Sequence, residues 1–401
     1  MVGPDANGTS APRRGPLLAV GALALLVAGA GTATAVVLSQ DDAEPTTAVR
    51  ASPAPVTTTT AAPRAEPSAA PAEAPGGVQG TIWVANEAQG SLTAIDASTY
   101  EVVTTATGIE GPHNVQVSPD GRSLWAVSGH DGAALMLDAS TLASHGVTAT
   151  GGSPAHVVVS PDGKTAYATS SADGTVSAID TSTMEILAAI PVGDGAHGLR
   201  PSPDGSSVYV ANVGSTTLSV IDTSEHETVA TVEVGEAPAQ VAFSPDGTFV
   251  YASLSGEGAL TKVDVASREL VATVQVGDVP IQTYVTPDGK HVLVANQGSE
   301  DAPGTTVSVV DAAAMEVVAT IETGRGAHGV VVEPTGRFAY VTNLYDDDVA
   351  VIDLEQLAVV AKVRVGDMPN GISFSPVTVA ARGDAELTMP HADSDAGGHG
   401  H

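Results

Sequence analysis

Short runs of β-branched and aliphatic residues, separated by turn sequences, follow one another along most of this chain. The clearest copy of the pattern covers residues 202–235. It opens with Ser202-Pro203-Asp204-Gly205, a tight turn in which proline presets φ, aspartate accepts local hydrogen bonds and glycine takes positive φ. Three β-prone runs follow the turn, at residues 207–212, 218–222 and 228–232, and a further run at 240–243 leads to the next turn. Four short strands with a turn at each break predict one antiparallel sheet.

One aspartate recurs at the end of the third strand of every unit: Asp96, Asp138, Asp180, Asp222, Asp264, Asp311 and Asp353. Five of the six gaps between them are 42 residues, and the sixth is 47. A period of this length marks an array of similar units. A residue present in every unit usually builds the unit. We therefore interpret these aspartates as turn residues whose carboxylates accept hydrogen bonds from backbone N–H groups two or three residues further on.

Several such sheets in sequence predict a β-propeller, an all-β fold. The tight turn occurs seven times, at Ser118, Ser160, Ser202, Ser244, Thr286, Glu333 and Ser375. The aspartate series starts before the first tight turn and ends before the last one. The sheet that contains Asp96 therefore lacks an inner strand, and the turn at Ser375 is followed only by a tail. Residues 81–107 can supply three outer strands of one blade, and residues 371–375 its inner strand. We predict a seven-bladed propeller of four-stranded antiparallel blades over residues 80–376, closed where the two ends share a blade.

The second strand of several units carries a recognisable motif. Tyr340-Val341-Thr342-Asn343 resembles the signature of the YVTN-repeat β-propellers, with variants such as Trp83-Val84-Ala85-Asn86 and Tyr209-Val210-Ala211-Asn212 in register. The resemblance covers roughly residues 80–376. It implies an exported or surface propeller, similar to surface-layer repeat proteins and to the propeller of cytochrome-type nitrite reductases. Three units keep the pattern without the asparagine, so that residue is not required in every blade.

Composition and charge narrow the range of functions. The chain has 401 residues, of which 43% are hydrophobic and 3% aromatic, so its core must be mostly aliphatic. There are 46 acidic and 15 basic residues, giving a formal net charge of -31. Such a surface repels nucleic acid, which we exclude as a partner. The absence of cysteine excludes disulfides, thiolate metal sites and a cysteine nucleophile.

The N-terminal part predicts an export or anchoring signal. Residues 16–38 form an uncharged apolar run long enough to span a bilayer as a helix, and Arg13 and Arg14 precede it. We expect residues 1–15 to be a cytoplasmic tail and the propeller to lie outside the cytoplasm on a single-pass membrane anchor. The alternative is a signal peptide cut near residues 33–35, which would give a secreted protein. Residues 39–79, rich in Ala, Pro and Thr, predict a disordered stalk.

Four histidines mark the place where we expect chemistry. In a propeller, the loops before the inner strand and the loops after the second strand share one face, the mouth of the central channel. His113, His197 and His328 occupy one position at the start of their inner strands, and His156 occupies the next position. Imidazole is a common ligand of zinc and copper, so these residues are candidates to bind a divalent transition metal (Cu or Zn) or an anionic ligand. The alternative is that they hydrogen-bond the loop backbone, as Asn370 can in the same position.

The C-terminal residues 377–401 predict a flexible acidic tail that contains histidine. His391, His399 and His401, with Asp393 and Asp395, are a second candidate group for loose metal binding. The alternative is a solvated tail with no fixed role.

Three functions remain open. The first is a membrane-anchored, monomeric binding or protein-interaction scaffold with protein or cell-envelope partners and no catalysis. The second is a metal-binding or redox-partner propeller that uses the channel-mouth histidines. The third is a lactonase-like hydrolase. Carboxylates would be expected at the channel mouth of such an enzyme, and the starts of the inner strands offer His, Gln and Asn instead.

Overall fold

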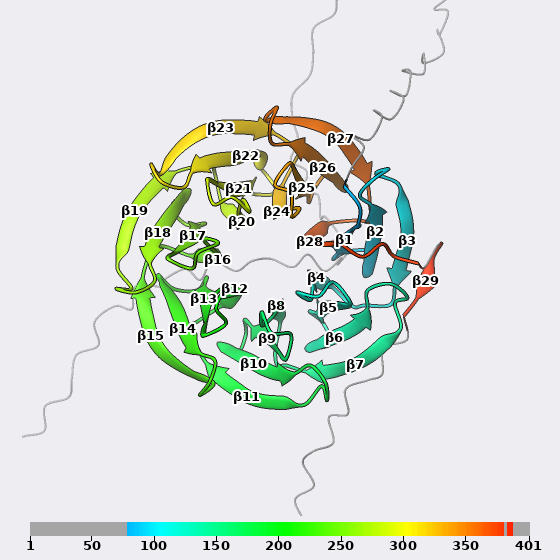
Figure 1. Cartoon of the computed structure of the whole chain (residues 1–401), viewed down its shortest axis with the longest axis horizontal. Helices are drawn as coiled ribbons and strands as arrows, with labels where there is room; N and C mark the ends of the chain where they lie inside the picture. Colours follow the sequence, from blue (N-terminus) through cyan, green and yellow to red (C-terminus); the bar gives the residue numbers. More distant parts are fainter. Residues whose placement is uncertain (1–77, 381–382, 388–401) are drawn as a thin grey trace, which may run out of the picture. The chain divides into compact units, whose positions relative to one another are not determined.

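The computed structural model describes residues 78–380 and 383–387. Within these residues the strands form seven sheets arranged as a ring around a central channel (Figure 1). Each sheet has four antiparallel strands, and one sheet has a short fifth strand. The predicted all-β, seven-bladed propeller is therefore confirmed.

Each blade runs from an inner strand at the channel to an outer strand at the rim (Figure 1). The inner strands are β4 (Pro112–Val117), β8 (Pro154–Val159), β12 (Ala196–Pro201), β16 (Pro238–Phe243), β20 (Pro280–Val285), β24 (Ala327–Val332) and β28 (Pro369–Ser375). The second strands are β1 (Thr81–Asn86), β5 (Ser123–Ser128), β9 (Thr165–Ser170), β13 (Ser207–Asn212), β17 (Phe249–Leu254), β21 (His291–Gly298) and β25 (Phe338–Asn343). The third strands are β2 (Ser91–Asp96), β6 (Ala133–Asp138), β10 (Thr175–Asp180), β14 (Thr217–Asp222), β18 (Ala259–Asp264), β22 (Pro303–Asp311) and β26 (Asp348–Asp353). The outer strands are β3 (Val102–Thr107), β7 (Ser144–Ala149), β11 (Ile186–Pro191), β15 (Glu227–Glu233), β19 (Leu270–Gln275), β23 (Glu316–Glu322) and β27 (Ala358–Arg364).

The two ends of the propeller share one blade, as predicted. β28 pairs antiparallel with β1, with Thr81 opposite Ser375 and Val84 opposite Ile372. The chain stays on this blade beyond residue 376: Val379 is 2% exposed in a hydrophobic cluster, and β29 (Ala385–Glu386) pairs with the rim strand β3. Residues 377–380 and 383–387, which the sequence analysis assigned to the tail, therefore pack against the propeller.

The core lies between neighbouring blades rather than inside any one of them. Tyr167 of β9, for example, packs in one cluster with Val208 and Val210 of β13 in the next blade. The third residue of the second strand is a fully buried aromatic side chain in six blades: Trp83, Trp125, Tyr167, Tyr209, Tyr251 and Tyr340. In the seventh blade the residue is Leu293. The few aromatic residues of the chain are thus concentrated where flat side chains fill the space between facing sheets.

The repeated polar residues stabilise turns and strand pairs. Each of the seven repeated aspartates accepts a hydrogen bond from a backbone N–H two or three residues further on, as predicted; Asp180, for example, accepts from Ser182 N at 2.8 Å and Thr183 N at 3.0 Å. The motif asparagine Asn212 donates to hydroxyl oxygens of β14. Both residue types therefore have structural roles.

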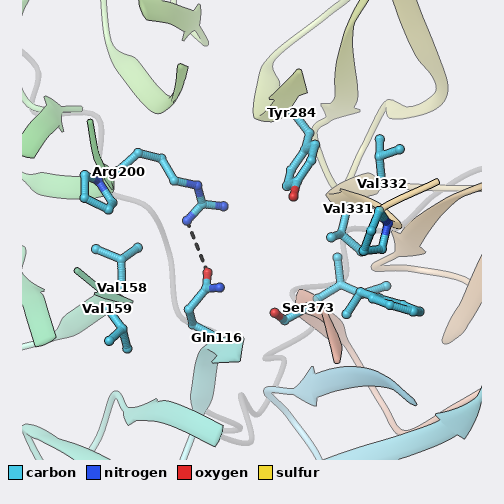
Figure 2. A pocket seen from close by; sticks show the side chains of 12 residues that line it. Gln116, Val158, Val159, Arg200, Tyr284, Val331, Val332 and Ser373 are labelled. Atoms are coloured by element: carbon cyan, nitrogen blue, oxygen red, sulfur yellow. Dashed lines mark hydrogen bonds between the residues drawn. The ribbon is translucent and has the colours of Figure 1, made fainter. Parts of the chain in front are cut away.

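The central channel contains a cavity of about 280 Å³ (Figure 2). Residues of six inner-strand regions line it, and it lies nearer the face that carries the Ser-Pro-Asp-Gly turns, because Pro201 and Pro334 border it.

The predictions for residues 1–15, 16–38 and most of 39–79 lie outside the described residues. Among the residues that are described, the structure contains no helix with the length and apolar character needed to cross a bilayer.

Candidate metal centre at the mouth of the central channel

Irregular strand pairing directs the histidines into the channel mouth. The register between inner and second strand shifts between Pro112 and Val115 in β4, and at the equivalent place in β8 and β12. An extra residue at such a bulge re-aims the neighbouring side chains. His113, His156 and His197 lie inside these three shifts, and His328 lies inside the equivalent shift of β24.

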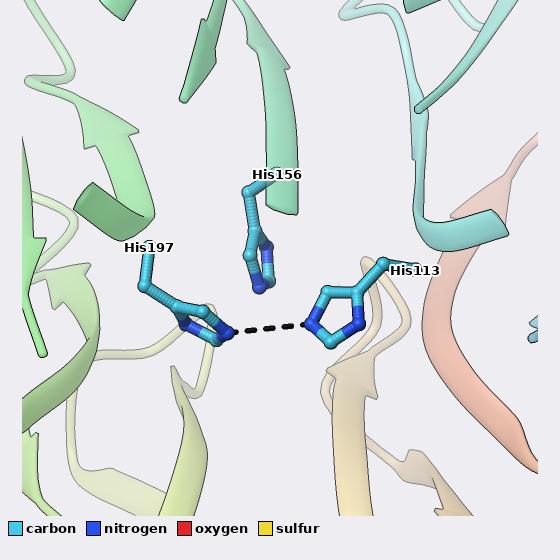
Figure 3. A group of neighbouring side chains, drawn as sticks. All are labelled: His113, His156 and His197. Carbon is cyan, nitrogen blue, oxygen red and sulfur yellow. Dashed lines mark hydrogen bonds between the residues drawn. The ribbon is translucent and has the colours of Figure 1, made fainter. Parts of the chain in front are cut away.

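Three of the four predicted histidines come together. His113, His156 and His197 project from three successive blades, and one ligand atom from each lies within 4.8 Å of the others (Figure 3). The Nε2 atoms of His113 and His197 are 3.3 Å apart. The ring centroids are 4.8 Å apart for His156 and His197 and 5.6 Å apart for His113 and His156.

The partners of the outward-facing nitrogens determine which nitrogen points into the site. His197 Nδ1 is 2.9 Å from the carbonyl oxygen of Ala239, which can only accept, so His197 carries its proton on Nδ1. His113 Nδ1 is 3.2 Å from Glu87 Oε2, to which it can donate, and 3.0 Å from Asn370 Nδ2, from which it can accept, so its partners are compatible with both tautomers of His113. His197 Nε2 is therefore unprotonated, and its lone pair faces His113 Nε2 across the site.

A proton or a metal ion must lie between two nitrogens at this separation. A proton on His113 Nε2 can fill the space as a hydrogen bond to His197 Nε2. A metal ion can replace that proton, because Zn–N bonds of about 2.0–2.1 Å at tetrahedral angles separate two nitrogens by about 3.4 Å. His156 adds a buried Nε2 that has no hydrogen-bond partner among the described residues. The site thus offers a metal three imidazole nitrogens.

A glycine makes room for this arrangement. A Cβ at Gly198 would lie 2.4 Å from Gln240 Oε1 and 2.5 Å from the carbonyl oxygen of Ala239. Any side chain at this position would push blade β16–β19 away and separate the Ala239 carbonyl from His197. Gly198 therefore supports the orientation of the neighbouring imidazole.

Burial keeps most of these imidazoles neutral. Loss of solvent, followed by the effect of the neighbouring histidines, lowers the pKa of His197 to about 4 and that of His328 to about 3. The same causes lower the pKa of His156 well below its ordinary value. Neutral imidazole is the form that ligates metals. The histidines are therefore ready to bind a metal at neutral pH.

His328 lies beside this group. Its ring centroid is 6.0 Å from that of His113, and its Nδ1 has no hydrogen-bond partner within the described part of the chain. The three-residue group that could hold a metal ion does not include it. The predicted tail histidines His391, His399 and His401 lie outside the described residues.

Glu87 is a site residue that the sequence analysis missed. Burial alone would raise the pKa of its carboxyl, but the hydrogen bond and charge of His113 and the amide of Asn370 outweigh burial and lower this pKa to about 2. Asn370 donates a hydrogen bond to the carboxylate. The sequence does contain a feature that points to Glu87. This residue follows the motif asparagine Asn86, in a loop of the channel-mouth face. No other blade has an acidic residue at that position.

The lowered histidine pKa values predict acid sensitivity of the metal-free chain. Unfolded histidine takes up a proton near pH 6.5, whereas His197 in the folded chain does so only near pH 4. The unfolded state therefore binds more protons between these values, and the free energy of unfolding should fall as pH falls, by up to about 3 kcal/mol for His197. We expect H197Q to reduce this pH dependence, measured by urea unfolding in EDTA at pH 7 and pH 4.5. H145Q, at an exposed strand position, is the control; equal slopes for both variants would contradict the prediction.

The comparisons with known proteins agree on the fold. A family model described as a YNCE-like β-propeller matches residues 130–379. No curated protein matches the chain. Hydrazine synthase from Kuenenia stuttgartiensis is similar in structure, with 25% identity and a TM-score of 0.62, over 68% of this chain and 91% of that chain.

Two further solved structures have lower identity. A protein of unknown function from Desulfotomaculum acetoxidans is 15% identical with a TM-score of 0.64, over 74% of this chain and 99% of that chain. A candidate 6-phosphogluconolactonase from Bacteroides fragilis is 17% identical with a TM-score of 0.63, over 74% and 98%. At these identities the likeness shows the shared fold alone.

Proposed function

This chain belongs to the YNCE-like β-propeller family, and from that premise we propose that it binds one transition metal ion, copper or zinc, at the mouth of the central channel. One observation carries the proposal. Three buried or half-buried imidazoles from successive blades converge within 4.8 Å, and two of them face each other through Nε2 while their Nδ1 atoms are held by Ala239 and Glu87.

Glu87 would not bind the metal itself but would orient a histidine that does. Metal-binding histidines usually donate their other N–H to a carboxylate or a backbone carbonyl, which fixes the tautomer and ring orientation. Glu87 supplies the carboxylate for His113, and Ala239 supplies the carbonyl for His197. Among divalent first-row metals, a nitrogen site of this kind binds Cu²⁺ most tightly.

The proposal includes a location and a mode of action. The apolar run 16–38 with Arg13 and Arg14 before it supports a propeller held outside the cytoplasm by a membrane anchor. We propose that the propeller acts there as a monomeric binding scaffold for metal and for protein or cell-envelope partners. Glu87, the carboxylate beside the histidines, is engaged by His113 and Asn370, which favours binding over hydrolysis.

A titration with Cu²⁺ and Zn²⁺ tests the proposal. The chain is purified without a nickel column, stripped with EDTA and titrated against a chelator of known affinity, both in full length and ending at residue 387 to remove the tail histidines. We expect one tight site per chain in both forms. Electron paramagnetic resonance of the copper form should show nitrogen ligands. Tight binding that disappears with the tail would contradict a site at the channel mouth.

A further inference from the structure

A second set of non-repeating residues lies deeper in the channel. The fifth residue of every inner strand occupies one level there: Gln116, Val158, Arg200, Ala242, Tyr284, Val331 and Ser373. All except Ala242 line the cavity of about 280 Å³, which we call the channel chamber (Figure 2). His197 and Arg200 are three residues apart, so the chamber lies about 10 Å below the candidate metal centre.

Arg200 is the one charged residue at this level, and it has no acidic partner. Its Nη1 is 3.4 Å from Gln116 Oε1 and 3.4 Å from the carbonyl oxygen of its neighbour Leu199. No carboxylate of the described residues forms an ion pair with it, in a chain of formal net charge -31. Burial lowers the pKa of Arg200, because the half-buried guanidinium has less solvent around it than a surface arginine. Arg200 is half-buried and has no charged partner among the described residues, so its guanidinium is available to pair with an anion that enters the channel.

Two further donors line the chamber across from the guanidinium (Figure 2). Tyr284 projects into the chamber from the side opposite Arg200 (Figure 2). Burial raises the pKa of Tyr284, so its hydroxyl keeps its proton and can donate. Ser373 Oγ accepts a hydrogen bond from Val117 N at 3.0 Å, which leaves its own proton available for a ligand. The site therefore offers an anion one charged and two neutral donors.

The remaining walls are apolar. Val158, Val332, Ile372 and Phe374 line the chamber beside the polar residues. A fully hydrated inorganic ion would leave these walls facing water, whereas an anion with a small hydrocarbon body would cover them. At about 30 Å³ per water molecule in the liquid, the cavity holds the volume of roughly nine waters, enough for an acid of a few carbon atoms.

We propose that the channel chamber binds a small organic carboxylate, with its carboxylate paired to the Arg200 guanidinium and its hydrocarbon part against the valine walls. Arginine suits this role because its planar fork can donate two parallel hydrogen bonds to one carboxylate. Tyr284 and Ser373 would complete the donor set. The ligand would enter from the face that carries the Ser-Pro-Asp-Gly turns, where Pro201 and Pro334 border the chamber.

Ligand-observed NMR titration of the full chain in EDTA tests this proposal independently of the metal centre. The probes are isovalerate, its neutral analogue isovaleramide, and inorganic phosphate. We expect saturable binding of isovalerate with at least tenfold weaker binding of isovaleramide and phosphate. Equal binding of the amide, tighter binding of phosphate, or no saturable binding of isovalerate would each overturn the proposal.

Variants locate the binding site. R200Q should weaken isovalerate binding at least tenfold, and Y284F should weaken it by a smaller factor. R122Q changes an exposed arginine on the same face and should leave the affinity unchanged. If R200Q does not fold, R200K keeps the charge but not the fork, and should still bind several-fold more weakly than the parent chain. Unchanged affinity in a folded Arg200 variant would overturn the assignment.

Discussion

Replacing His197 with alanine is expected to lower the affinity of the channel mouth for Cu²⁺ more than about 100-fold. Removing a residue that only hydrogen-bonds to a metal ligand typically costs about 10–100-fold, and the loss of a ligand itself should cost more. The substitution removes one of two facing Nε2 atoms and leaves His113 and His156 without a third nitrogen. The measurement is chelator competition with a chain that ends at residue 387, so that the tail histidines cannot contribute. H145A, at an exposed histidine, is the control and should bind like the parent chain.

Glu87 distinguishes a metal centre from a purely structural cluster in the same titration. E87Q keeps the size of the side chain but weakens its ability to hold the proton on His113 Nδ1, so we expect a 10–100-fold loss of metal affinity. E101Q changes an exposed glutamate in the same blade and should have no effect. Unchanged affinity in both H197A and E87Q would show that copper binds elsewhere.

The sequence predicted the fold because its signal is repeated. Every blade has an aspartate with the same turn role, and most gaps between these residues are equal. The strands of a blade whose own sequence is ambiguous can therefore be assigned from the spacing of the other blades. The closing blade followed from the same repeat, because Asp96 lacked a preceding tight turn and Ser375 lacked following strands. The contacts of Val379 and β29 followed from no repeat, since those residues belong to no unit.

The candidate site was predicted only in part. His113, His156, His197 and His328 could be placed at the channel mouth from their strand positions, but which three come close enough to share a metal depends on the local backbone path and on ring orientation. Neither is encoded in spacing.

Glu87 and Arg200 were missed for a related reason. Each stands at a position that in other blades carries a neutral residue of the repeat, namely the residue after the second strand and the fifth residue of the inner strand. Both residues stand out when equivalent positions of the seven blades are compared, because each is charged where the other six residues are neutral. In a propeller, such departures converge because equivalent positions of all inner strands face one channel.

Ending the chain at residue 368 is expected to prevent the propeller from folding to a stable monomer. The truncation removes β28, which pairs with β1 through five residue pairs and brings Ile372 into the core cluster between the first and last blades. At about 1 kcal/mol for each lost hydrogen bond, together with the exposed apolar surface, the loss is comparable to the whole stability of a typical domain, about 5–15 kcal/mol. The unpaired edge of β1 would also be free to pair with other chains.

Two further truncations separate the closing strand from the segments that follow it. A chain ending at residue 387 keeps all described contacts and should have the oligomeric state and melting temperature of the full chain. A chain ending at residue 376 keeps β28 but loses Val379 and β29, and should melt at a lower temperature while staying monomeric. Size-exclusion chromatography and circular dichroism measure all three. A monomeric chain ending at residue 368 that melts within a few degrees of the parent would show that the ring does not need its closing strand, because the remaining six inner strands would then be sufficient to hold the blades together.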